Sequence, residues 1–278
     1  AQFFEVGVFT GASAYEGDIE RSGNPIKDAN LAYGLFGRYH FSRMLTFKAQ
    51  VYRARISADD ANAEQFSPRW RRNLSFRNDI TEVAFITELN ILGYQPYGLY
   101  EVFSPYIYAG IGAGFHNPQA NFNDEWINLQ PLGTEGQGIG DRPDLYSKNF
   151  LVVPFGFGVK VALNDKWNIG LDIGARYTGF DYLDDVSTTY LSRAELLAGT
   201  SHPDPDLVVA LANRTGEVRG LGGEPTDFRT GAIRGSDEFE DWYYVAGITI
   251  SYNFIDNGLV GARNRIRRRG PNCPGNKF

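Results

Sequence analysis

The sequence feature that most constrains the fold is a strict two-residue alternation near the end of the chain. From Trp242 to Phe254, even positions carry aromatic or aliphatic side chains, and odd positions are mostly small or polar. Side chains of a β-strand point alternately to opposite faces, so one face is apolar in the middle and aromatic at both ends. This is typical of a strand that crosses a lipid bilayer. Residues 167–177, which begin with Trp167 and end with Tyr177, repeat the pattern.

Six further segments follow the alternation less cleanly, because Pro154 and several glycines interrupt them. They are Phe4–Tyr15, Leu31–Phe41, Met44–Ala54, Ile80–Leu92, Tyr106–Phe115 and Phe150–Leu163. Together with the two clear strands they make eight, an even number that allows an antiparallel barrel to close. Glycines inside these strands allow tight curvature or leave room for large inward neighbours.

The connections between these segments alternate in length, with every long one on the same side. Short or intermediate connections are expected at 42–43, 93–105 and 164–166, and long ones at 16–30, 56–79, 116–149 and 183–241. Outer-membrane barrels have short periplasmic turns and long external loops, whereas a soluble sandwich has no reason for this arrangement. The sequence therefore predicts an all-β protein: an eight-stranded antiparallel transmembrane β-barrel with extracellular loops over residues 1–255. A basic periplasmic C-terminal tail is expected over residues 256–278.

Composition narrows the function classes. With 278 residues, 42% of them hydrophobic, the chain has enough apolar residues for a sizeable core. Its one Cys excludes a disulfide scaffold and any multi-Cys metal site, and we expect no cofactor. A formal net charge of −6 gives no reason to expect nucleic acid as a partner. No signal peptide is recognisable, and a start at Ala1 suits a mature chain in the outer membrane of a Gram-negative bacterium.

Strand parity predicts which side chains point into the barrel and which face lipid. Four acids and four bases are expected to form ion pairs in the lumen: Glu5, Glu82, Glu88, Asp172, Arg38, Lys48, Lys160 and Arg176. The lumen of an eight-stranded barrel is only wide enough for side chains, so we expect a plugged barrel and no pore. Six aromatic residues are expected at the lipid interface: Trp167, Tyr177, Trp242, Tyr244, Tyr252 and Phe254.

Residues that could carry catalysis or bind a metal ion are few. The three histidines, His40, His116 and His202, have no recognisably spaced Ser, and no Gly-x-Ser-x-Gly motif is present, so no catalytic site is expected. The acidic clusters around Asp184 and Asp241 are expected to be solvated loop charge, with Ca²⁺ binding as the alternative. No metal site is assigned.

Two loop segments have local signals of their own. Residues 133–138 are glycine-rich but neither follow a strand nor open a helix, so they do not predict a phosphate-binding loop. Asp204 followed by Pro205 predicts the start of a short helix. That helix belongs either to a packed cap over the barrel or to a contact surface for another protein.

The C-terminal tail carries five arginines and the only Cys. They are Arg263, Arg265, Arg267, Arg268, Arg269 and Cys273. One interpretation is a disordered basic end that touches phospholipid headgroups. The other is a docking segment, because an unpaired Cys in an oxidising compartment suggests an intermolecular disulfide or a reactive thiol.

Three stretches of the sequence resemble the PorG family. They are the segments RNLSFRNDI at 72–80, LQPLGTEGQG at 129–138 and DYLDDVSTTY at 181–190, and the likeness extends from Phe4 to Phe254. PorG proteins are outer-membrane barrels of the type IX secretion system of Bacteroidota. The resemblance implies a non-enzymatic role, in which the barrel anchors a periplasmic ring of the lipoprotein PorK and its partner PorN to the outer membrane.

The resemblance implies that the ring contact lies in the periplasmic parts of the chain. These are the tail, with Cys273 as a candidate for a disulfide with PorK, and the intermediate connection with Tyr94 and Tyr97. Outer-membrane lipids are the other expected partner. Two other functions remain open: an outer-membrane enzyme that modifies lipid, and a soluble β-sandwich such as a lectin.

Overall fold

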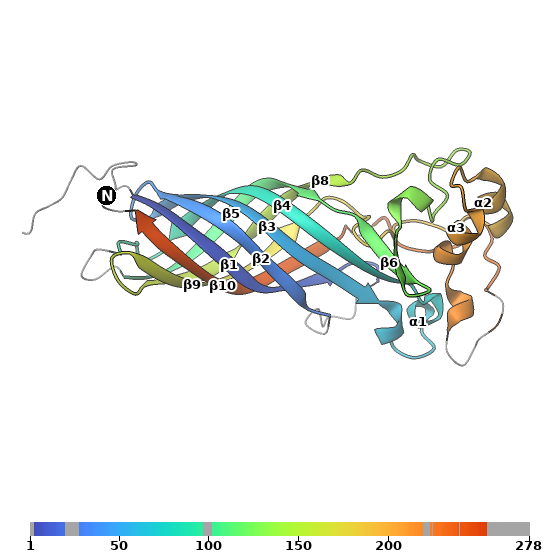
Figure 1. The fold of residues 1–278 in the computed structure, drawn as a ribbon, viewed down its shortest axis with the longest axis horizontal. Helices are drawn as coiled ribbons and strands as arrows, with labels where there is room; N and C mark the ends of the chain where they lie inside the picture. Colours follow the sequence, from blue (N-terminus) through green and yellow to red (C-terminus); the bar gives the residue numbers. More distant parts are fainter. Residues whose placement is uncertain are drawn as a thin grey trace, which may run out of the picture.

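The computed structural model describes residues 3–19, 28–96, 102–218, 223, 225–238 and 240–254. These residues form a closed barrel with a packed cap at one end (Figure 1). The barrel strands are β1 (Phe3–Glu16), β2 (Asn30–His40), β3 (Leu45–Asp59), β4 (Ser75–Asn90), β5 (Phe103–Phe115), β8 (Asn149–Ala162), β9 (Trp167–Tyr177) and β10 (Trp242–Phe254). The predicted eight-stranded antiparallel barrel is confirmed.

Antiparallel pairing between consecutive barrel strands closes the sheet on itself. The order is β3-β2-β1-β10-β9-β8-β5-β4, and β3 also pairs with β4. A short hairpin of β6 (Pro118–Phe122) and β7 (Glu125–Asn128) extends the sheet at the cap end of β4 through pairs such as Arg77 with Gln119. No helix in the described ranges has the length and apolar character needed to span a membrane.

Strands β3 and β4 each extend five residues further toward the cap than the sequence analysis predicted. Residues 56–59 and 75–79 of the connection expected over 56–79 are strand, with register pairs from Leu45–Leu89 to Asp59–Ser75. In this extension the inward positions, such as Ile56 and Phe76, are apolar and pack into the cap, while the outward positions, such as Arg55, are polar. The sequence analysis required an apolar outward face for each strand. This part of the hairpin lies above the apolar band, so its outward face is polar and its inward face is apolar.

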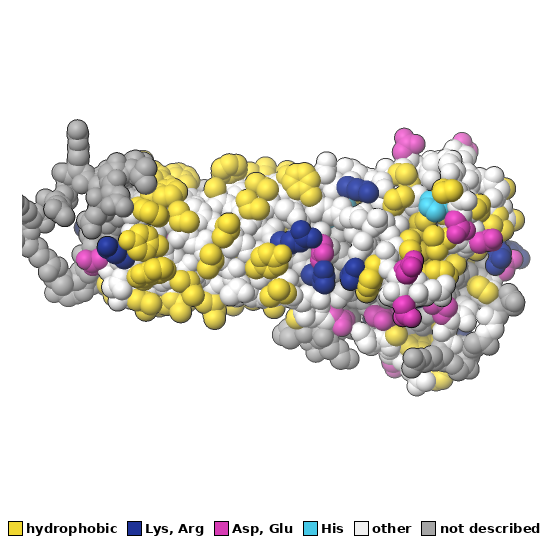
Figure 2. Space-filling model, in the orientation of Figure 1, with side chains coloured by type: hydrophobic (Ala, Val, Ile, Leu, Met, Phe, Trp, Pro, Cys, Tyr) yellow, Lys and Arg dark blue, Asp and Glu magenta, His cyan; other side chains and the backbone are white. Residues whose placement is uncertain are grey.

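The outer surface of the barrel is apolar in a band that ends below the cap. Figure 2 shows hydrophobic side chains spread over the barrel, and charged side chains mainly at its ends and over the cap. Exposed apolar residues come from every barrel strand, including Val8, Leu35, Val51, Phe85, Ile111, Leu151, Leu171 and Ile250. In water these side chains would form a large apolar surface, whereas against lipid hydrocarbon they are well solvated.

The cap is built from the long connections and has its own apolar core. It contains α1 (Pro68–Arg72), α2 (Arg193–Gly199), α3 (Pro205–Ala212) and the single turns η1 (Asp60–Asn62), η2 (Gln130–Leu132) and η3 (Thr215–Glu217). Helix α3 begins as predicted, since the Asp204 side chain accepts from the Leu207 N–H and Pro205 occupies the first turn. Leu132, Leu183 and Leu211 pack in one continuous core with apolar residues of the upper barrel.

Candidate functional site

The eight ionisable residues expected in the lumen all lie inside the barrel, at most 2% exposed. Glu88 of β4 is the centre of the group nearest the short turns. Arg38 Nε lies 2.8 Å from Glu88 Oε1, Lys160 Nζ 2.8 Å from Glu88 Oε2, and Lys48 Nζ 3.5 Å from Glu88 Oε1. Arg38 also places Nη1 2.7 Å from Glu5 Oε1. Arg38 and Lys48 are direct cross-strand neighbours, and the Glu88 carboxylate offsets their repulsion.

A second group of lumen charges lies closer to the cap. Asp172 Oδ2 is 3.3 Å from Lys48 Nζ, and the hydroxyls of Tyr106 and Tyr108 donate to the same carboxylate. Further toward the cap, Glu82 Oε2 is 3.3 Å from Arg176 Nε and accepts from the Tyr243 hydroxyl at 2.6 Å. Four acids balance four bases, so the charges of these eight residues sum to zero. Paired charges and tyrosine rings therefore lie side by side in the lumen.

The end of the lumen beside the short turns is closed by a polar cluster around His40. His40 Nε2 lies 2.7 Å from Glu5 Oε2, and His40 Nδ1 lies 2.9 Å from the Thr46 hydroxyl. A hydroxyl, an imidazole and a carboxylate in a row is the arrangement of a hydrolase triad. Thr46 and His40 are both fully buried, however, so the hydroxyl has no access to a substrate. The cluster therefore orders the barrel end.

Tyr94, which was expected to contact a partner, lies in this same closed end. It is 1% exposed, and its hydroxyl donates to Asn168 Oδ1 at 2.6 Å, so its side chain seals the lumen and does not face outward. Tyr97 and the predicted tail residues lie outside the described residues. These tail residues are Arg263, Arg265, Arg267, Arg268, Arg269 and Cys273.

The six aromatic residues expected at the lipid interface all lie on the outer face of the barrel. Trp167 and Tyr252 meet edge to face at one end of the β9–β10 pair, with ring centroids 5.2 Å apart. Trp242 and Tyr177 meet at the other end at 5.1 Å. Tyr244 lies near this end, and Phe254 lies beside Tyr252. The aromatic pairs therefore stand at the two ends of an apolar stretch, as in the girdles of membrane barrels.

The three stretches that carry the family resemblance meet in the cap, although they are far apart in the sequence. Asn78 of the first stretch donates to the Leu183 carbonyl at 2.8 Å. Thr134 of the second stretch donates to the Asp185 carboxylate, and Glu135 accepts from the Ser187 N–H at 3.0 Å. The glycine-rich segment therefore supplies a buried carboxylate to the cap.

Two arginines, the half-buried Arg72 and the buried Arg234, connect the loops of the cap. Arg72 Nε lies 2.7 Å from Asp60 Oδ2, and Arg72 Nη1 donates to the Arg234 carbonyl. Arg234 Nη1 in turn lies 3.1 Å from Glu135 Oε1 and donates to the Asp185 carbonyl. Three of the long connections are held together in this way by charge-assisted hydrogen bonds, the strong class of such bonds.

Part of each acidic cluster is buried, and the expectation of solvated loop charge is wrong for Asp184, Asp185 and Asp241, whereas Asp237 and Glu238 are exposed. Asp184 and Asp241 are at most 1% exposed, and the Tyr15 hydroxyl lies 2.7 Å from a carboxylate oxygen of each. A phenol has one proton to donate, so one of the two contacts requires a protonated carboxyl group. Burial, and then the nearby Asp18 carboxylate, raise the pKa of Asp184 to about 8. Burial and the Asp184 charge also raise the pKa of Asp241.

This cluster shows no metal-binding arrangement. Across the described ranges, no three His, Cys, Asp or Glu side chains are grouped so that they could hold a metal ion. Burial likewise raises the pKa of the neighbouring Asp181 to about 8. The raised pKa values of these carboxyl groups favour their neutral, protonated forms. Sequence reasoning missed this because parity and spacing carry no information about how loops fold over one another.

The other two histidines also lie in the cap or beside it. His116 accepts from Asn78 Nδ2 at 3.0 Å through Nδ1 and lies 3.2 Å from the Ser147 carbonyl through Nε2. Burial lowers the pKa of His116 to about 4, so the ring is neutral and structural. His202 Nδ1 accepts from the Asp204 N–H at the start of α3. Neither ring has a hydroxyl nucleophile as a hydrogen-bond partner.

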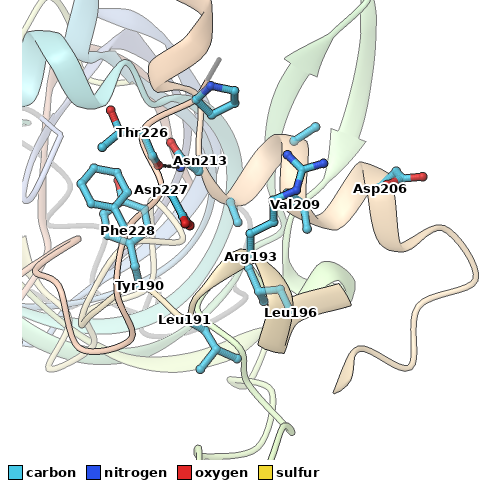
Figure 3. Close-up of a pocket in the computed structure, with 13 residues that line it drawn as sticks. Tyr190, Leu191, Arg193, Leu196, Asp206, Val209, Asn213, Thr226, Asp227 and Phe228 are labelled. Carbon is cyan, nitrogen blue, oxygen red and sulfur yellow. Dashed lines mark hydrogen bonds between the residues drawn. The ribbon is translucent and has the colours of Figure 1, made fainter. Parts of the chain in front are cut away.

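The cap contains a pocket of about 540 Å³ between α2, α3 and the segment before β10 (Figure 3). Tyr190 and Phe228 stack at its wall with ring centroids 4.2 Å apart, and Asn213 Nδ2 donates to the Thr226 carbonyl at 2.7 Å. The Arg193 side chain extends toward Val209 of α3 in Figure 3. The lining is mainly apolar and contains no grouping of a nucleophile with a base.

The chain was compared with known proteins and structures. No curated protein matches it. Similar solved structures include Ail, the attachment invasion locus protein of Yersinia pestis, at 9% identity and TM-score 0.41, covering 91% of this chain and 99% of that chain. Neisserial surface protein A is similar at 7% identity and TM-score 0.41, covering 90% of this chain and 97% of that chain. The outer membrane protein OprG from Pseudomonas aeruginosa is similar at 11% identity and TM-score 0.40, covering 91% of this chain and 95% of that chain.

The family comparison gives a match over more than half of the chain. The matched region, residues 1–197, runs from β1 through β9 and into α2, and it includes all three stretches that meet in the cap. The chain belongs to the family described as Domain of unknown function (DUF6089).

Proposed function

We propose that this protein is an outer-membrane barrel that serves as an anchor and does not conduct solutes. The observation that carries the proposal is the lumen, where eight paired charges and the rings of Tyr106 and Tyr108 occupy the interior beneath a packed cap. We expect no continuous water-filled path through a barrel filled in this way. It can still hold another assembly at the membrane through its turns and termini.

We further propose that the anchored assembly is the periplasmic ring of the type IX secretion system, as the resemblance to PorG implies. In this proposal the long-loop end with the cap faces outward and the short turns face the periplasm, as in other outer-membrane barrels. The C-terminal tail then lies in the periplasm, where its arginines and Cys273 contact PorK and PorN. The support for this part is the sequence resemblance together with the plugged barrel.

Affinity purification of the full chain from solubilised outer membrane tests the role. PorK and PorN are expected among the co-purified proteins identified by mass spectrometry. Non-reducing gels of wild type and Cys273→Ser are expected to differ by one high-mass adduct that contains PorK. A matched control is the double variant Cys273→Ser, Ser147→Cys, which moves the single Cys to an exposed position at the cap end and should give no such adduct. Absence of both ring proteins from the wild-type sample would refute the role.

Conductance in planar bilayers tests the anchor mechanism separately. Wild-type protein is expected to give no steady channel current, because paired charges and tyrosine rings lie side by side in the lumen. The double variant Lys48→Ala, Asp172→Ala removes one pair together and is expected to raise conductance. Open channels of wild type would show that the plug is not closed. The alternative of a lipid-modifying enzyme has no specific observation in its favour.

A further inference from the structure

The outward face of β3 and β4 changes abruptly from apolar to basic at one level of the barrel. Val51 and Val83 form the last apolar outward pair of this hairpin. Above it the outward positions are Arg53 opposite Thr81, Arg55 opposite Asp79, and Ser57 opposite Arg77. Figure 2 shows dark-blue side chains gathered where the apolar surface meets the cap. Three arginines therefore stand directly above the lipid-facing band.

The positive charge of these arginines is only partly neutralised. Arg55 binds Asp79 through two contacts, 2.6 Å from Nε to Oδ1 and 2.9 Å from Nη2 to Oδ2. Arg53 reaches the same carboxylate only at 3.5 Å, and its side chain is 54% exposed. Three guanidinium groups against one carboxylate leave two positive charges.

The third arginine, Arg77, is oriented by the β6–β7 hairpin. Its Nε donates to Gln119 Oε1 at 3.1 Å, and its guanidinium carbon lies 3.6 Å from the ring centroid of Trp126. Trp126 is itself exposed, and Trp is enriched at the headgroup level of membranes. This stacking fixes the guanidinium plane and leaves its other N–H groups to an outside acceptor.

The charge of the three arginines and their position at the edge of the apolar band favour a phosphorylated ligand. Like charges that are adjacent on a sheet face destabilise it unless an anion lies between them. Guanidinium groups present paired N–H donors that match the oxygens of a phosphate. At the level where the apolar band ends, the groups that meet the protein are lipid headgroups.

We propose that Arg53, Arg55 and Arg77 form a binding site for the phosphate of a lipid headgroup in the leaflet at the cap end of the barrel. Asp79 positions Arg55, and Trp126 positions Arg77. The site rests on the membrane orientation given above and is independent of the secretion role, because it lies on the outer wall away from the short turns. Loss of the ring contact would therefore leave lipid binding intact.

Binding of bisphosphorylated lipid A in detergent micelles tests this site, with dephosphorylated lipid A as the comparison. The variant Arg53→Gln, Arg55→Gln, Arg77→Gln is expected to bind the bisphosphorylated lipid at least about tenfold more weakly, because three cations are lost at the membrane surface. The control Arg71→Gln, Arg193→Gln, Arg229→Gln removes the same charge from exposed cap positions and should bind as wild type does. Wild type should prefer the bisphosphorylated lipid.

Heat-dependent gel mobility reports whether each variant is folded. If the triple variant does not fold, Arg53→Gln alone is the test, because Arg53 makes only the 3.5 Å contact with Asp79, and it should weaken binding severalfold. Equal binding of the two lipids by wild type would overturn the proposal. So would equal loss in the control, or displacement of the lipid by inorganic phosphate at the same concentration, which would indicate a site for free anions.

Discussion

Removing the carboxylate of Glu88 is the sharpest test of how the lumen is held together. Glu88 is fully buried and receives Arg38, Lys160 and Lys48 at 2.8, 2.8 and 3.5 Å. Glu88→Gln keeps the size of the side chain and deletes one negative charge. The lumen then holds three acids against four bases, with an uncompensated positive charge out of contact with water.

The expected cost follows from the burial of the group. Breaking a buried ion pair by removing one partner typically costs about 3–5 kcal/mol, because the remaining charge stays desolvated. Glutamine leaves no cavity, so little of the loss comes from packing. We therefore expect the free energy of unfolding to fall by about 3–5 kcal/mol. A second substitution, Lys160→Met, removes the excess positive charge and should recover part of this loss.

Urea titration in lipid vesicles, followed by tryptophan fluorescence and gel mobility, measures these free energies. Thr87→Ala is the matched control, because Thr87 is the neighbouring residue of β4 and is exposed on the outer face. Its effect should be within about 0.5 kcal/mol. The reasoning is refuted if Glu88→Gln costs no more than the control, or if adding Lys160→Met makes the barrel still less stable.

Three further predictions concern the cap and the packing of the lumen. The raised pKa of Asp184 means that the folded cap holds a proton that the unfolded chain releases. The cap is therefore most stable at acidic pH and loses stability as the pH rises through about 8. Proteolysis of the cap should be faster at pH 9 than at pH 6, and Asp184→Asn should flatten this dependence. Arg234→Met leaves Glu135 buried without its cation and should lower the thermal stability of the cap, as near-ultraviolet circular dichroism would show; an unchanged melt would contradict the assigned pair. Gly174→Val puts a side chain where the Tyr108 hydroxyl lies and should reduce the yield of refolded barrel, whereas Ala175→Val on the outer face should not.

Much of the barrel is predictable from sequence, because strand alternation is a local property. The bounds of the strand Trp242–Phe254 agree with the structure, and strand parity placed all eight lumen charges on the correct face. The extensions of β3 and β4 were missed because their outward residues, such as Arg55, are polar. An alternation with inverted polarity is the signal that would have found them.

The cap was less predictable, because it depends on contacts between distant loops. The start of α3 at Asp204 and Pro205 is a local capping signal and was found. The joint contact of Asp184 and Asp241 with Tyr15 was not found, since the two residues are 57 positions apart and become neighbours only when the last long connection folds back onto β1. Spacing along the chain does not reveal that these carboxyl groups are desolvated.

The sequence by itself determined that the chain forms antiparallel strands, which face of each strand meets lipid and which residues point inward. These follow from the two-residue period and from the position of turn residues. Only the tertiary structure decided which lumen side chains pair with one another. Arg38 meets Glu5 on the neighbouring strand and Glu88 across the lumen, because barrel closure brings strands together that do not pair with each other. The protonation of the cap acids was decided in the same way, because burial and neighbouring charges, which exist only in the folded chain, determine their pKa values.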